Sequence, residues 1–142
     1  MTDAGKRARD YLQRLMDEEQ DIRLLQGRAA AFRDMAVSVT PHLSGVPGTC
    51  SSDMQRNAGR MDEAIDLEAE AESKRQAWLR HRREAKDYIG QIASSSERNV
   101  LQSRYLDGLS WSMVALALGY SEPSMFRIHR RALEHLGRLL PC

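Results

Sequence analysis

The chain has 142 residues and a formal net charge of +1, with 21 lysines and arginines against 20 aspartates and glutamates. This length suits one modest domain, or a small domain with an extension, and argues against a single large globular core. No apolar run could cross a bilayer and the N-terminus lacks the apolar centre of a secretory signal, so we expect a cytoplasmic protein with no membrane contact. From residue 95 onward six arginines oppose four acidic residues, a mild positive bias.

Residues 3–37 are expected to form one long amphipathic helix. Apolar side chains recur there in alternating steps of three and four, the spacing of a coiled-coil seam. The seam positions are Ala8, Tyr11, Leu15, Glu18, Ile22, Leu25, Ala29, Phe32 and Ala36. Prolines and glycines in residues 40–52 then break the helix and predict a loop.

A second long helix is expected from about residue 53 to 93, folded back antiparallel to the first. Its weaker seam consists of Ala64, Leu67, Ala71, Lys74, Trp78, His81, Ala85, Tyr88 and Ile92. Lys74 and His81 predict places where the seam is hydrated or faces a partner, and the aromatic residues of both seams are interpreted as core. The two cysteines, Cys50 and Cys142, are predicted to be reduced thiols.

The junction after the second helix has the spacing of a capping box. Ser94 is followed three residues later by Glu97, a pattern that can end one helix and begin the next. Val100, Leu101, Tyr105 and Leu109 are then expected to form one wall of a compact three-helix unit.

The C-terminal segment has the spacing of a helix-turn-helix. A short helix reaches Ala115, the turn falls at Leu118–Gly119, and Ser121 can cap a second helix with its hydroxyl. Gly119 suits a left-handed turn, and Pro123 falls in the first helical turn, where a missing N–H breaks no bond. The predicted inward face of the second helix is Met125, Ile128, Ala132 and Leu136.

The outward face of this second helix is the candidate DNA-binding surface. Ser124 and Arg127 lie near its start, from where they can reach base edges, and an arginine can bind guanine through two donors. Arg130 and Arg131 lie further along and are expected to contact phosphates. Ser112, in the preceding helix, is the fifth predicted contact, whereas Trp111 is expected to pack against the core.

These residues resemble region 4 of bacterial sigma factors, in which a helix-turn-helix reads the promoter −35 element. The matching residues are Arg104-Tyr105, Gly108-Leu109-Ser110-Trp111, Val114-Ala115, Leu118-Gly119 and the run 127–133. With its helical hairpin ahead of that unit, the whole chain is similar to the small phage- and prophage-encoded sigma-like regulators of the ArpU type. The resemblance implies a transcriptional regulator that binds double-stranded DNA, with RNA polymerase as a further candidate partner.

We therefore expect an all-α protein with two parts. Residues 1–94 form a long antiparallel hairpin for dimerisation or polymerase contact, and residues 95–142 form a DNA-binding helix-turn-helix. Two alternatives stay open. One is a small terminase-type DNA-packaging protein, which also joins a helix-turn-helix to helical oligomerisation segments. The other is a sigma-like protein that binds RNA polymerase and redirects or inhibits it, a role compatible with Pro123 and the modest charge.

No catalytic, cofactor or metal site is expected. The four histidines, at positions 42, 81, 129 and 135, are scattered, and no cysteine or acidic pair has the spacing of metal ligands. The sequence has no glycine-rich phosphate loop and no nucleophile elbow. It therefore predicts neither an enzyme activity nor a small-molecule substrate.

Overall fold

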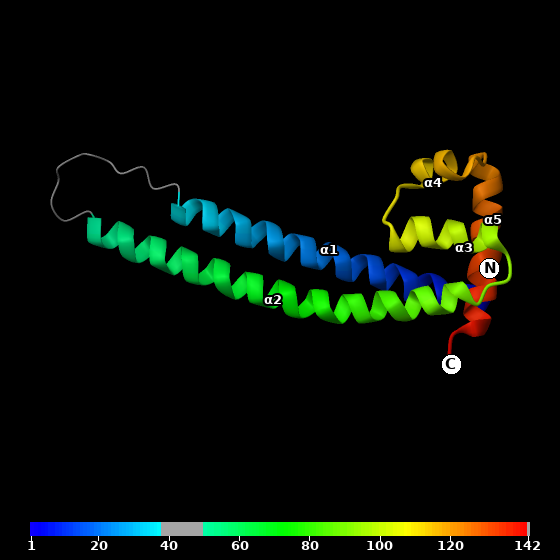
Figure 1. Ribbon diagram of the computed structural model, residues 1–142, viewed down its shortest axis with the longest axis horizontal. Helices are drawn as coiled ribbons and strands as arrows, with labels where there is room; N and C mark the ends of the chain where they lie inside the picture. The colour runs from blue at the N-terminus through cyan, green and yellow to red at the C-terminus, as the bar shows by residue number, and fades with distance from the viewer. Residues whose placement is uncertain (38–49, 142) are drawn as a thin grey trace. The chain divides into compact units, whose positions relative to one another are not determined.

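The computed structural model describes residues 1–37 and 50–141, with side chains from residue 54 onward in the second segment. Every regular element in these residues is a helix, so the all-α prediction is confirmed. In chain order the elements are α1 (Asp3–Val37), α2 (Cys50–Gly90), α3 (Ser95–Leu101), the π-helical turn η1 (Gln102–Leu106), α4 (Trp111–Leu118) and α5 (Glu122–Leu139) (Figure 1). The first ten residues of the loop predicted at 40–52 and both cysteine side chains lie outside the described residues. The last three residues of that predicted loop, 50–52, belong to α2, which begins earlier than expected.

The chain divides into two compact units. The first unit consists of Met1–Glu18 together with Ala77–Cys142, and the second unit is Glu19–Gln76. In the second unit α1 packs against α2 along the predicted seam, where the buried residues are Ile22, Ala29, Ala64, Leu67 and Ala71. Arg33 on α1 donates two hydrogen bonds of 2.9 Å to the carboxylate of Glu68 on α2. The small alanines let the two backbones approach closely, and the side chain of Lys74 is exposed, as expected for a hydrated position.

Within the first unit, paired side chains show that α1 and α2 are antiparallel. The rings of Tyr11 and Tyr88 meet edge to face at 6.4 Å, and one heptad away Glu18 Oε2 lies 2.8 Å from His81 Nδ1. As α1 advances from Tyr11 to Glu18, α2 therefore runs back from Tyr88 to His81. Glu18 and His81, each a polar position in its own predicted seam, thus face each other.

The main core of the first unit joins both ends of the chain. Its buried residues are Ala8, Leu12 and Leu15 of α1, Ala85 and Ile89 of α2, Ile92 of the junction, and Leu101, Tyr105, Leu106, Ala132, Leu133 and Leu136 of the C-terminal helices. This core crosses the boundary predicted at residue 94, because the C-terminal helices bury apolar side chains against the start of α1 and the end of α2.

The junction between α2 and α3 has only half of the predicted capping box. The Ser94 hydroxyl accepts a hydrogen bond from the backbone N–H of Glu97 at 3.4 Å, so the cap itself is confirmed. The expected return bond from the Glu97 side chain is wrong, because its buried carboxylate instead lies 2.6 Å from His135 Nδ1 on α5. Arg98 donates hydrogen bonds to the carbonyls of Ile92 and Ala93, which satisfies acceptors left free at the end of α2.

Candidate nucleic-acid interface

Helix caps define the helix-turn-helix at both sides of its turn. The Ser110 hydroxyl accepts a hydrogen bond from Met113 N at 3.3 Å and begins α4. Gly119 ends α4 with φ of 73°, a left-handed conformation that glycine adopts without strain. The Ser121 hydroxyl then accepts from Ser124 N at 3.3 Å and begins α5, as predicted.

A small separate core holds the two motif helices together. Val100, Val114, Ala115 and Met125 are buried in it, with Leu109, Trp111, Leu118, Tyr120 and Ile128 packed around them. The predicted inward face of α5 is confirmed, because Met125, Ala132 and Leu136 are fully buried and Ile128 is half-buried. Leu133 is buried as well, which the pattern did not predict, since this side of α5 meets the main core.

Trp111 packs into an aromatic cluster under the start of α5, as expected. Its ring centroid lies 4.5 Å from that of His129 and 5.2 Å from that of Phe126. The Arg104 guanidinium lies over the same indole, 4.6 Å from its centroid. Tyr105 Oη lies 2.9 Å from His129 Nε2, within hydrogen-bond distance. None of these pairings follows from spacing in the sequence.

The Tyr105–His129 pair is neutral. Burial, followed by the positive charges of Arg104 and Arg9, lowers the pKa of His129 from 6.5 to about 4. Burial also raises the pKa of Tyr105 above its ordinary value. His129 therefore adds no positive charge to α5 at neutral pH, and the charge that this helix presents comes from its arginines.

The predicted contact residues of α5 lie on its outward face. Arg127, Arg130 and Arg131 are exposed and Ser124 is half-buried. Arg127 Nη2 and Ser121 Oγ donate hydrogen bonds of 3.2 and 2.9 Å to Ser124 Oγ, so the structure brings Ser124 and Arg127 together. Ser124 accepts both bonds, which leaves its own hydroxyl proton available to another acceptor.

The other three predicted contact residues, Arg130, Arg131 and Ser112, are not joined to the Ser124–Arg127 pair by a hydrogen bond within the described residues. Within the described part of the chain, Arg130 and Arg131 form no ion pair, and their guanidinium groups are therefore available to an anion. Ser112 is exposed on α4, apart from the α5 group. Two large apolar side chains, Met113 and Leu116, lie beside it on α4 with exposed fractions of 49% and 75%.

The start of α1 packs against the far half of α5, a contact that the sequence patterns did not predict. Gly137 lies against the backbone of Ala4, and Arg7 Nη2 donates a hydrogen bond of 3.3 Å to the Gly137 carbonyl. A side chain at Gly5 would meet Glu134 of α5. The signal for this contact was present, because glycine inside a helix lowers stability and often indicates close approach of another backbone.

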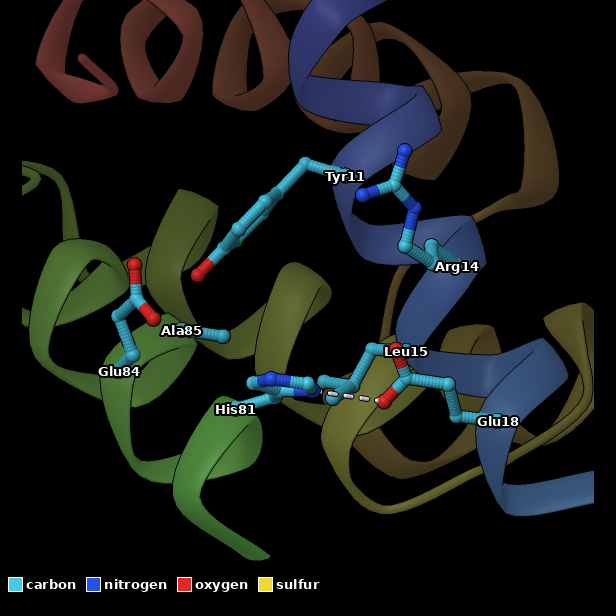
Figure 2. A pocket seen from close by; sticks show the side chains of 7 residues that line it. All are labelled: Tyr11, Arg14, Leu15, Glu18, His81, Glu84 and Ala85. Carbon is cyan, nitrogen blue, oxygen red and sulfur yellow. Dashed lines mark hydrogen bonds and ion pairs between the residues drawn. The ribbon is translucent and has the colours of Figure 1, made fainter. Parts of the chain in front are cut away.

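A cavity of about 220 Å³ lies between the start of α1 and the end of α2 (Figure 2). It is lined by Tyr11, Arg14, Leu15, Glu18, His81, Glu84 and Ala85. Burial, followed by the nearby Glu84 carboxylate, raises the pKa of Tyr11 to about 12. The Tyr11 hydroxyl therefore stays protonated at neutral pH and cannot act as a general base there.

The described residues contain no cluster of three or more histidine, cysteine, aspartate or glutamate side chains that could hold a metal ion. Across the same parts of the chain, no helix is both long enough and apolar enough to span a membrane.

Comparison with known proteins places the chain in a family. The family model described as a protein of unknown function, DUF1492, matches residues 60–137, more than half of the chain. The chain belongs to the DUF1492 family. The part that defines DUF1492 here includes α2 from Arg60 onward and the C-terminal helices as far as Gly137. Neither the curated proteins nor the solved structures include a match to the chain.

Proposed function

We propose that this protein is a sequence-specific DNA-binding transcriptional regulator of the phage or prophage type, as its resemblance to sigma region 4 and to the ArpU-type regulators implies. The observation that carries the proposal is the stretch of α5 up to Arg131, where three exposed arginines follow a capped helix start. A helix-turn-helix inserts this part of its second helix into the major groove. Residues 121–131 contain Arg127, Arg130 and Arg131 but only one acidic residue, Glu122.

The proposed contacts are of two kinds. Arg127 and Ser124 lie within two turns of the helix start, where side chains meet base edges, and the Ser124 proton can serve as a donor. Arg130 and Arg131 lie one turn later and are suited to phosphates on the groove walls. Ser112 on α4 belongs to the second kind, because the first helix of the motif crosses the DNA backbone.

A homodimer is part of the proposal. The second unit, residues 19–76, leaves large apolar side chains exposed, among them Leu24 at 56% and Ile65 at 50%. Exposed apolar surface of this kind is common where another chain binds. Sedimentation of the full chain would distinguish a dimer from the ring-shaped oligomer expected of a small terminase-type packaging protein.

Protein binding is the second candidate function, and α4 supports it. Met113 and Leu116 expose apolar surface that DNA phosphates cannot satisfy. A sigma-like protein that occupies RNA polymerase, and redirects or inhibits it, would use such a surface. In that case Leu116→Asp should abolish capture of polymerase while leaving the helical content unchanged.

The deciding experiment is selection of bound DNA from a random duplex pool, with and without RNA polymerase holoenzyme. Enrichment of one sequence by the protein alone is the expected result. Enrichment only with the holoenzyme would favour the polymerase-binding role, and capture of polymerase without any DNA affinity would reject the DNA-binding proposal.

A further inference from the structure

The start of α1 and the far half of α5 form one surface. Gly137 has no room for a side chain because the Ala4 backbone occupies that space, and Arg7 bonds to the Gly137 carbonyl. Ala8 and Leu12, in the next turns of α1, are buried in the same core as Leu133 and Leu136 of α5. The first turns of α1 are therefore held against α5 by backbone contact and by shared core.

This contact limits how much of α5 a DNA groove can receive. Glu134, in the turn after Arg131, is half-buried and Gly5 of α1 lies beside it, so α1 borders the outward face of α5 just beyond Arg131. The six residues from Arg131 to Gly137 span about 9 Å along the helix, less than the roughly 12 Å width of the major groove. A duplex seated on Arg127 and Arg131 therefore brings one groove wall, with its phosphates, next to α1.

Two basic residues of α1 are available at this place. Lys6 and Arg9 are exposed and lie three residues apart, on the same side of the helix. Arg9 is also close enough to α5 for its charge to contribute to the lowered pKa of His129, the neighbour of Arg130. The ion pair that Arg9 forms with Asp10, at 3.8 Å, is long and exposed, and such a pair contributes little.

We propose that Lys6 and Arg9 of α1 contact DNA phosphates beside α5, so that both ends of the chain build the DNA-binding surface. The inference rests on the proposed DNA-binding function and adds a second group of contacts to it. These contacts are independent of base sequence, because lysine and arginine bind a phosphate by charge and by hydrogen bonds. They supplement the modest charge of the C-terminal segment.

The test compares single variants of the full chain in DNA titrations at several salt concentrations. Lys6→Ala and Arg9→Ala should each lower the affinity for DNA about fivefold at 0.15 M salt. Each should also reduce the salt slope, the steepness with which the logarithm of the binding constant falls with the logarithm of salt concentration, by about one. The loss should be equal on the selected duplex and on an unrelated one. Arg9→Lys, which keeps the charge, should retain the parent slope.

The matched control is Arg14→Ala on the same helix. Arg14 lies about 140° round the helix from Arg9 and lines the cavity with Glu18 and His81, so its removal should change neither affinity nor slope. If Lys6→Ala and Arg9→Ala bind like the parent while Arg131→Ala is weakened, DNA does not reach α1 and the inference is overturned, although the proposed function stands. If the parent itself binds no duplex, both are rejected.

Discussion

The backbone of Ala4 in α1 lies so close to Gly137 in α5 that position 137 has no room for a side chain. Gly137→Ala should therefore push the two helices apart. Overpacking of this kind costs about 1–3 kcal/mol, more than the roughly 1 kcal/mol that alanine gains over glycine inside a helix. Thermal and urea unfolding should show a less stable protein.

Gly27→Ala in α1 is the control for that substitution. Among the described residues, no atom beyond the local backbone of α1 lies within 4 Å of a Cβ built at Gly27. Only the gain in helix propensity therefore remains, and the variant should be more stable by up to about 1 kcal/mol. If both variants were equally stable, the packing of α1 on α5 would be contradicted.

The neutral state of His129 predicts a dependence of stability on pH. Its folded-state pKa of about 4 lies below the ordinary 6.5, so between these values the unfolded chain binds a proton that the folded chain excludes. This contribution to stability is present above pH 6.5 and is lost as the pH falls towards 4. The free energy of unfolding should therefore change with pH by at most about 1.4 kcal/mol per pH unit, and by less than this because the ring is only partly buried.

Unfolding of the parent and of His129→Gln should be compared across this range. The free energy of unfolding of the variant should fall less steeply between pH 6.5 and 4 than that of the parent, because the contribution of His129 is gone. This difference is expected whatever the stability of the variant at neutral pH. NMR titration of the parent gives a direct reading, and a His129 ring that titrates near pH 6.5 would rule out the buried neutral state.

Two arginines on α5 should differ in how their loss affects DNA binding. Arg127→Ala should cost about 1–3 kcal/mol on the preferred duplex and relax the preference at one base pair. Arg131→Ala should weaken all duplexes alike and lower the salt slope by about one. Salt titrations of both variants on selected and unrelated DNA check this, and parent-like binding by both would show that this face of α5 does not meet DNA.

Neighbouring positions on α1 should separate the hairpin seam from the exposed surface. Ile22 is 5% exposed, so Ile22→Asp places a charge in a dry seam and should cost several kcal/mol. Leu24 is 56% exposed, so Leu24→Asp should leave helicity unchanged and weaken any dimer that uses this surface. Circular dichroism and sedimentation measure the two effects. Equal melting curves for Ile22→Asp and the parent would contradict the seam.

The local patterns of the sequence predicted most of the helices and their caps. Steps of three and four placed Ile22 and Ala29 on the buried side of α1, and Ser121 and Gly119 marked the turn of the motif. Such features depend on residues within a few positions of one another. Helical periodicity and capping chemistry therefore determine them without knowledge of the fold.

Contacts between distant segments were decided only by the tertiary structure. Glu97 has the sequence spacing of a capping box, but its carboxylate pairs with His135 because packing of α3 on α5 brings that ring within 2.6 Å. Likewise, nothing near Gly137 in the sequence indicates Ala4 as its neighbour, since the two are brought together by the shared core beneath α1 and α5. Periodicity shows which face of a helix is buried, but the partner of that face is decided by how all the faces pack together.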